Sequence, residues 1–147
     1  MYKHILVATD GGPLSKKAIQ TAIALCKTCK AKLTVLTVVS PYPLVYFEGA
    51  ALPSMKEIEK VEAGWIASAQ KIVDKACDAA LKQEVTAQAV TVKSGSVADA
   101  IIATSKKNKC NLIVMASHGR KGLKRILLGS ETQHVLTHST TPVLVLR

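Results

Sequence analysis

Short apolar runs alternate with helical segments along the whole chain, and this alternation restricts the fold more than any other feature. Apolar runs typical of strands cover His4–Thr9, Lys32–Val39, Val85–Lys93, Leu112–Ser117 and Thr141–Arg147. Apolar residues at helical spacing predict helices that start at Pro13, run from Ser54 to about Lys82, cover Val97–Lys107 and cover Ser130–Ser139. Strands separated by helices pair in parallel through crossover connections. We therefore predict a doubly wound α/β fold, in which helices cover both faces of a parallel sheet.

Length and composition predict a single domain over residues 1–147. The chain has 147 residues, of which 48% are hydrophobic, enough to bury one complete core. The longest apolar runs, Ile5–Ala8 and Val143–Leu146, are too short to cross a bilayer, and the N-terminus leads into a strand rather than a signal peptide. The four cysteines lie within regular segments rather than in loops, which fits a reducing compartment. We expect a cytoplasmic protein that has no membrane partner.

The net charge of +10 favours anionic ligands without specifying which anion. Aromatic residues make up only 3% of the chain, so it lacks the stacking platform of proteins that bind single-stranded nucleic acid, and we do not expect a nucleic-acid partner.

We expect no metal site either. Cys26 and Cys29 form a CxxC pair without a second pair, and their helical setting favours two ordinary helix residues. His134 and His138 stand four apart, but no acidic residue in the sequence pattern completes a ligand set, which favours two surface histidines.

In doubly wound sheets, ligands bind beyond the carboxyl ends of the strands, where the strand order reverses. The candidate residues are therefore Ala8, Thr9 and Asp10 at the end of the first strand, the end of the second strand, Gly95, and the segment that follows Met115. Asp10 could contact a ligand or could cap the helix that follows it. His118 could contact a ligand or could be an ordinary loop residue. The sequence leaves both choices open.

A glycine-rich basic segment follows the fourth strand and favours a phosphate site. Glycine lets backbone amides approach a ligand, and the start of a helix offers unpaired N–H groups and a partial positive charge, so Gly119 and Gly129–Ser130 together predict an anion cradle. Thr132 adds a hydroxyl group. Four basic side chains raise the local positive potential: Arg120, Lys121, Lys124 and Arg125. Turns and helix caps use the same residues, but the position of this segment after a central strand favours a triphosphate ligand.

Two further segments have more than one interpretation. The connector Ser40–Pro53 contains Tyr42, Tyr46 and Phe47, and it could cover a site or simply join a strand to a helix. The last strand, Thr141–Arg147, should lie at an edge of the sheet, and an apolar edge strand invites antiparallel pairing with the same strand of a second copy. The alternative is that the C-terminal end folds against its own helices and the protein is a monomer.

Three stretches of the sequence resemble the universal stress protein (UspA-like) family in order and spacing. They are HILVATDGGPLSKKA near the start, GSVADAI in the middle, and VMASHGRKGLKRILLGSETQHVLTHSTTPVLVL at the end. The resemblance spans essentially the whole chain. It implies a Rossmann-like sheet of five parallel strands in the order 3-2-1-4-5, of the adenine nucleotide alpha hydrolase-like kind, and a homodimer. Nucleotide-binding members carry the motif G-x2-G-x9-G-S/T.

The resemblance also implies a set of site residues. Gly119, Gly129 and Ser130 would contact the phosphates and ribose, with Thr132 and the amide of Glu131 nearby. Asp10 would face the ribose and the backbone of Val38 the edge of the adenine, whereas Met115 and His118 would line the same pocket. Ala116 stands where the motif has its first glycine, and its extra methyl group would weaken binding. Gly12 replaces a serine that usually follows Asp-Gly, which makes a poorer helix cap.

The sequence thus predicts an ATP-binding stress-response protein, with or without Mg2+, that acts as a homodimer through residues 141–147 and whose nucleotide state is read by a protein partner. We expect no enzyme activity beyond slow ATP hydrolysis or autophosphorylation, for which Ser130 would be the first hydroxyl to test, because no residue is placed to activate water. One alternative is a dimeric interaction module of the same fold that binds no nucleotide. Another is an anion or nucleic-acid binder driven by charge.

Overall fold

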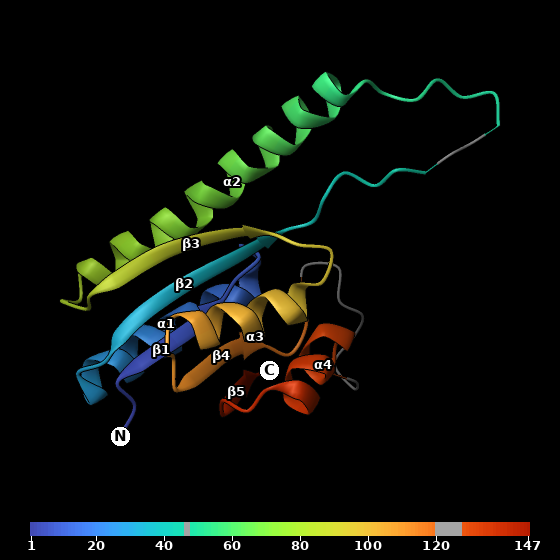
Figure 1. The fold of residues 1–147 in the computed structure, drawn as a ribbon. Coiled ribbons are helices and arrows are strands. Elements are labelled where there is room, and N and C mark those ends of the chain that lie inside the picture. Colours follow the sequence, from blue (N-terminus) through green and yellow to red (C-terminus); the bar gives the residue numbers. More distant parts are fainter. Residues whose placement is uncertain (46–47, 120–127) are drawn as a thin grey trace.

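Five parallel strands form one sheet in the order β3-β2-β1-β4-β5 in the computed structural model, which describes residues 1–45, 48–119 and 128–147 (Figure 1). The strands are β1 (His4–Ala8), β2 (Lys32–Val39), β3 (Ala87–Lys93), β4 (Leu112–Ala116) and β5 (Val143–Leu146). The helices are α1 (Pro13–Cys29), α2 (Met55–Leu81), α3 (Val97–Lys107) and α4 (Ser130–His138). The predicted fold class and strand order are confirmed, and β3 and β5 are the two edges of the sheet.

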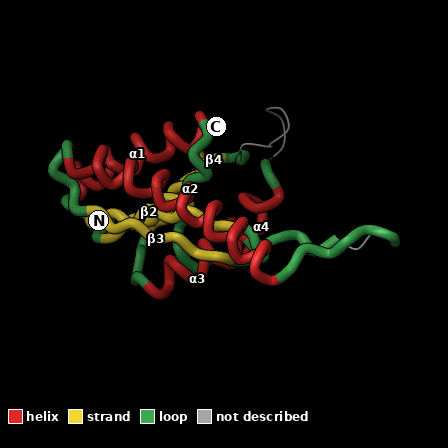
Figure 2. Tube along the Cα trace, turned by 90° about the horizontal axis from the view of Figure 1, so that it is seen from above, coloured by secondary structure: helices red, strands yellow, loops and turns green. Residues whose placement is uncertain are grey.

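Alternate residues of the central strand β1 belong to two separate cores, one on each face of the sheet. Ile5 and Val7 are buried with residues of α1 and α2, whereas Leu6 is buried with residues of α3 and α4. The period of two along a strand sends neighbouring side chains to opposite faces, and helices cover both faces here (Figure 2). This arrangement explains why β1 has a continuous apolar sequence rather than an alternating one.

Strands β3 and β5 start later than their apolar runs because the first residues of each run form hydrogen bonds with neighbouring turns. Val85 belongs to the turn after α2, where its N–H donates to the carbonyl of Ala80 at 3.0 Å and the preceding Glu84 has a φ of 62°. Thr141 N–H donates to the hydroxyl of Ser139 at 3.0 Å. Strand β3 therefore starts at Ala87, and β5 starts at Val143.

One residue of the connector between β2 and α2, Tyr42, packs against α2. Tyr42 stacks on Trp65, with ring centroids 6.0 Å apart and an interplanar angle of 12°. The predicted aromatic residues Tyr46 and Phe47 fall outside the described residues. In Figure 1 the connector and the N-terminal part of α2 extend beyond the sheet. The described helices include none that is long and apolar enough to span a membrane.

Candidate functional site

A pocket of about 210 Å³ lies at the carboxyl ends of β1, β2 and β4, where the chain crosses from one half of the sheet to the other. Its walls include most of the residues that the sequence singles out: Ala8, Thr9, Asp10, Val38, Met115, Ala116, His118, Gly119, Glu131 and Thr132. Gly129 and Ser130 immediately precede the last two of these on the chain. The structure thus brings the predicted segments together at one edge of the sheet.

Four wall residues were not assigned to the site from the sequence: Ser15, Leu36, Val97 and Ile101. Leu36 and Ile101 are buried in the core between the sheet and α3. Their apolar periodicity looks the same as that of any core residue, so the sequence carries no signal that would identify them. Gly95 was a candidate, but Val97 on α3 lies in the wall two residues farther along. The pocket therefore has an apolar wall beside its polar strand ends.

Asp10 closes the turn between β1 and α1. Its Oδ1 accepts hydrogen bonds from the Gly12 N–H at 2.8 Å and from the Ser15 hydroxyl at 2.7 Å. The turn also requires glycine at position 11, which has a φ of +79° and where a β-carbon would lie 2.9 Å from Cδ1 of Ile72. Asp10 therefore fixes the turn before α1, although no side chain caps this helix at Gly12, and the same carboxylate also lies in the pocket wall.

The start of α4 is bound tightly to the end of β4. The N–H of Gly129 donates to the carbonyl of Ser117 at 2.9 Å, and the Thr132 hydroxyl lies 3.1 Å from the carbonyl oxygens of Ala116 and Ser117. A β-carbon on Gly129 would lie 3.0 Å from the Ser117 oxygen, so glycine is needed for this close approach. The buried Thr132 hydroxyl thus holds the helix in place, a role that the sequence did not predict.

The first turn of α4 has the features of an anion site. The N-cap residue is Gly129, which has no side chain to accept from the first amides of the helix. These amides point toward the N-terminal end, where the helix dipole is positive. The basic residues predicted to strengthen this potential, Arg120, Lys121, Lys124 and Arg125, fall outside the described residues.

The comparisons with known proteins agree with this arrangement. Residues 1–147 match the model of the universal stress protein family. The chain belongs to this family. It is similar to universal stress protein YxiE of Bacillus subtilis, with 32% identity over 155 residues that cover 100% of both chains.

Two solved universal stress proteins have the same fold. The protein UspA from Lactobacillus plantarum has a TM-score of 0.82 at 21% identity, over 99% of this chain and 98% of that one. A universal stress protein solved in complex with cAMP has a TM-score of 0.73 at 25% identity, over 99% of this chain and 97% of that one. The first comparison shows the fold alone. The second adds a family member whose printed ligand is an adenine nucleotide.

This universal stress protein departs from the glycine motif at Ala116, the last residue of β4. The side chain is 8% exposed and lies in the pocket wall, and the Ala116 carbonyl accepts the hydrogen bond from Thr132. The methyl group therefore occupies space at the point where α4 and β4 meet. Gly119, which occupies the next motif position, stays close to Asp10: a β-carbon there would lie 3.2 Å from Oδ2.

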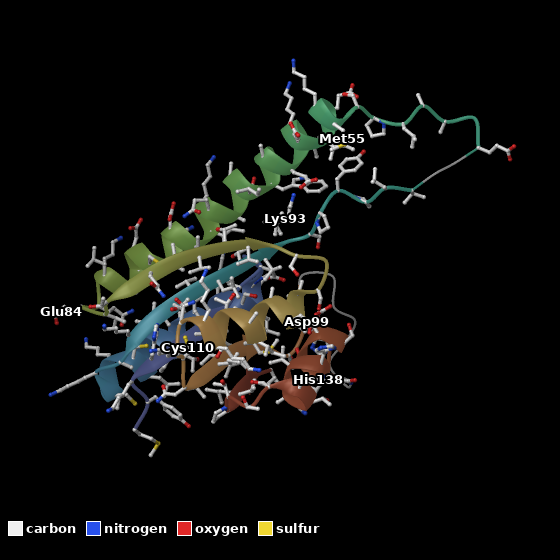
Figure 3. All side chains as sticks on the ribbon, in the orientation of Figure 1. Met55, Glu84, Lys93, Asp99, Cys110 and His138 are labelled. Carbon is white, nitrogen blue, oxygen red and sulfur yellow. The ribbon has the colours of Figure 1, made fainter. Side chains whose placement is uncertain are left out.

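Helices α3 and α4 are joined by two acidic side chains beside the pocket. Oε2 of Glu131 accepts from the Ala98 N–H at 2.7 Å, and Oδ1 of Asp99 lies 2.9 Å from Nε2 of His134. Hydrogen bonds from Ser96 and His134 lower the pKa of Asp99. Figure 3 shows Asp99 on α3 and His138 on α4 at this junction. Both carboxylates thus fix α4 relative to α3, which leaves the start of α4 well defined.

The two histidines of α4 are surface residues, as predicted, although the sequence did not reveal Asp99 as an acidic partner. The rings of His134 and His138 lie 4.2 Å apart between centroids. Within residues 1–45, 48–119 and 128–147, no group of three or more His, Cys, Asp or Glu side chains is arranged to hold a metal ion.

The CxxC pair belongs to α1, and all four cysteines are free thiols. Cys26 is buried beneath α1, and burial, followed by the nearby Cys29, raises the pKa of its thiol to about 12. Its Sγ lies 3.5 Å from the Lys32 carbonyl. A thiol that stays protonated is a poor nucleophile and metal ligand, so these residues fit the interpretation as ordinary helix residues.

Proposed function

We propose that this protein binds ATP in the pocket at the carboxyl edge of the sheet and acts as a nucleotide-dependent regulator in the stress response. The observation that carries the proposal is the start of α4, whose amides are capped by no side chain at Gly129 and lie beside the pocket. Backbone amides at a helix start favour phosphate groups because both hydrogen bonding and the helix dipole act in the same direction. The phosphates would lie at this helix start, near Gly129 and Ser130.

The remaining walls suit the other parts of an adenine nucleotide. Val38, Met115 and Ile101 provide an apolar surface for the adenine ring, and Asp10 provides a carboxylate that can accept from ribose hydroxyls. The related structure that contains cAMP supports an adenine nucleotide as the ligand class. Mg2+ would accompany the phosphates and would be held mainly by their oxygens, since the described residues provide no group of three ligands. We propose binding without catalysis, because no described wall residue is placed to activate water.

We also propose a cytoplasmic homodimer that forms through residues 141–147. Strand β5 is an edge of the sheet, and each of its four residues, Val143 to Leu146, is only partly buried in the single chain. An exposed apolar edge is stabilised when it pairs with the same strand of a second copy. A protein partner would then read the nucleotide state of the dimer.

Ala116 favours a second candidate function, a dimeric interaction module that binds no nucleotide. Its methyl group narrows the pocket at the position of the first motif glycine. If this methyl group blocks the ligand, the dimer surface would be the functional feature of the protein.

The first experiment identifies any nucleotide that copurifies with the protein, by mass spectrometry of a denatured extract. Calorimetric titration of ATP into the stripped protein then measures the affinity, with GTP as the matched competitor and with increasing salt. We expect stoichiometric ATP, preference over GTP and a modest salt dependence, because a buried adenine contributes apolar contacts. No bound nucleotide and no heat at millimolar ATP would contradict the proposal and favour the interaction module. Equal binding of all polyanions that collapses with salt would favour the charge-driven alternative.

A further inference from the structure

The apolar stripe of α2 continues past the sheet that covers it. In the C-terminal half of the helix, this stripe is buried against β2 and β3 through Ala69, Val73, Ala76 and Ala80. The same helical spacing continues toward the N-terminus through Ile58, Val61 and Trp65. Figure 1 shows that this end of α2 extends beyond the strands, and Figure 3 places Met55 at its tip. The sheet therefore ends before this half of the stripe, in which Ile58 is buried and Val61 and Trp65 are partly exposed.

Large apolar side chains are exposed around this free half of α2. Val61 is 39% exposed, Trp65 40% and Met55 72%. On the connector, Leu44 and Leu52 are also exposed. Isolated apolar residues on a surface are ordinary, but a group on one helix and its adjoining segment is typical of an interaction site.

The connector and α2 border an open surface hollow of about 540 Å³. It is lined by Tyr42, Ala51, Leu52, Pro53, Glu57 and Val61. Tyr42 fixes this end of the connector to the helix, because its ring stacks on Trp65. On the same helix, the Glu62 carboxylate pairs with Lys93 of β3 at 2.7 Å. The hollow is therefore held open by specific contacts, which lowers the entropy lost when a partner binds.

The charge of this surface differs in sign from that of the whole chain. Residues 42–66 contain four acidic residues (Glu48, Glu57, Glu59 and Glu62) and two basic ones (Lys56 and Lys60), a net charge of −2 that the pairing of Glu62 with Lys93 reduces to −1, in a chain of net charge +10. A partner with basic residues is attracted here but repelled elsewhere on the protein. The same charge disfavours an anionic membrane surface and a second copy of this acidic patch.

We propose that residues 55–66 of α2, with Tyr42 and residues 51–53 of the connector, form a docking site for an amphipathic helix of a partner protein, with leucine-like side chains on one face and lysine or arginine beside them. Residues 55–66 extend over roughly 18 Å at the helical rise of 1.5 Å per residue, which matches a partner helix of about three turns. The site lies at the β3 edge of the sheet, opposite β5. It stays accessible in a dimer formed through β5, and it does not depend on nucleotide binding.

The test uses a 14-residue fluorescein-labelled peptide of leucine and lysine with helical amphipathic spacing, and a peptide in which glutamate replaces every lysine. Because Trp65 is the only tryptophan in the chain, its emission reports on the site directly. We expect the leucine–lysine peptide to bind, to shift the Trp65 emission to shorter wavelength and to bind more weakly as salt rises. The leucine–glutamate peptide should bind at least about 10-fold more weakly, a difference of 1.4 kcal/mol.

Matched variants separate a specific site from general attraction. Val61→Glu should weaken peptide binding several-fold. Glu59→Lys, at an exposed residue, should do the same. Leu136→Glu, at a residue of similar exposure on α4, and Asp78→Lys, on the covered half of α2, should leave it within about twofold. Glu59→Lys keeps the test valid if Val61→Glu impairs folding.

Four results would each overturn the proposal. The first is that both peptides bind with equal affinity, and the second is that the control variants lose as much peptide affinity as the test variants. The third is that no peptide binds at millimolar concentration. The fourth is that, without peptide, the Trp65 emission shifts as the protein concentration rises or when anionic phosphatidylglycerol vesicles are added. The last result would assign the surface to a second copy or to lipid instead.

Discussion

The starts of α1 and α4 have similar local sequences but opposite electrostatic character. Each helix follows a buried strand, and each has glycine at its N-cap, Gly12 in α1 and Gly129 in α4. At α1, the turn holds the carboxylate of Asp10, which binds the Gly12 amide and the Ser15 hydroxyl. At α4, the Gly129 N–H donates to the carbonyl of Ser117, and the carboxylate of the first turn, Glu131, accepts from the Ala98 N–H of α3.

Because of this difference, one end of the pocket accepts hydrogen bonds from a ligand and the other end donates them. The α1 side presents a negative carboxylate that suits hydroxyl groups, whereas the α4 side presents amides that suit phosphates. The start of α3 also has acceptors from this chain, because Ser96 accepts from Asp99 N–H and Glu131 accepts from Ala98 N–H. Neither α1 nor α4 has a side-chain cap, but Asp10 places a negative charge at the start of α1, so among the described residues the start of α4 suits an external anion better.

Gly129→Val should remove the donor end and has the largest expected effect. The new side chain would press on the Ser117 oxygen, which lies 3.0 Å from the β-carbon position, and would displace the first turn of α4. We expect ATP affinity to fall by roughly 100-fold, which corresponds to about 2.7 kcal/mol, in a calorimetric titration. Gly64→Val on α2 is the matched control, because a β-carbon there meets no atom within 4 Å. Unchanged affinity in Gly129→Val would remove α4 as the phosphate site.

Asp10→Asn tests the acceptor end. The variant loses the charged acceptor for the Gly12 amide and Ser15 hydroxyl, so the unfolding free energy should fall by about 1.5–3 kcal/mol and the melting temperature by several degrees. ATP affinity should fall about 10-fold as the turn loosens. Ser15→Ala, which removes only one of the two partners, should have a smaller effect in the same thermal melt. A melting temperature equal to that of the unmodified protein would show that Asp10 does not hold the turn.

Ala116→Gly removes a methyl group from the pocket wall beside α4 and so tests whether this methyl group limits ATP binding. We expect ATP to bind a few-fold more tightly, while the unfolding free energy falls by about 0.5–1 kcal/mol because glycine loses more backbone entropy on folding. Ala89→Gly, on the exposed side of β3, should show the loss of stability without the gain in affinity. If ATP binding weakens in Ala116→Gly, the methyl group is a favourable contact rather than an obstacle.

The pair between Asp99 and His134 should give the smallest effect, visible in the pH dependence of stability. Hydrogen bonds from Ser96 and His134 lower the pKa of Asp99 in the folded state, with a smaller contribution from the charge of His138. The pair therefore stabilises the folded protein at pH values above the pKa that Asp99 has in the unfolded chain. This stabilisation is lost as the pH falls through the lower pKa of Asp99 in the folded protein.

A double-mutant cycle of Asp99→Asn and His134→Ala, followed by thermal melts over a range of pH, measures this contribution. We expect a coupling energy above the ordinary aspartate pKa that disappears in acid. Coupling that persists after Asp99 is protonated would mean that the contact is not electrostatic. Because both side chains are well exposed, the coupling should be small and should weaken with salt.

The sequence predicted the fold well because its signals are local. Periodicity of two or of 3.6 residues sets each strand and helix, and continuous apolar strands such as Leu112–Met115 indicate burial on both faces. The ends of β3 and β5 were less accurate, because turn hydrogen bonds at Val85 and Thr141 compete with the sheet. Such bonds depend on where neighbouring elements pack.

The candidate site was predicted in part. Residues at strand ends, such as Asp10 and Met115, follow from the rule that ligands bind at the carboxyl edge of a parallel sheet. Leu36 and Ile101 could not be found, because a pocket wall and a core contact have the same apolar pattern. The structural role of Thr132 was also hidden, since its acceptors lie 15 and 16 residues away along the chain.

The sequence by itself determined the alternation of strands and helices, the parallel sheet and the glycines that the turns require. Only the tertiary structure decided which helix start is occupied by Asp10, which one is left to a ligand, and where the sheet stops covering α2. The physical reason is that backbone preference and periodicity act over a few neighbouring residues. Hydrogen-bond partners and burial depend instead on segments that meet in space, such as Ser117 with Gly129 and Tyr42 with Trp65.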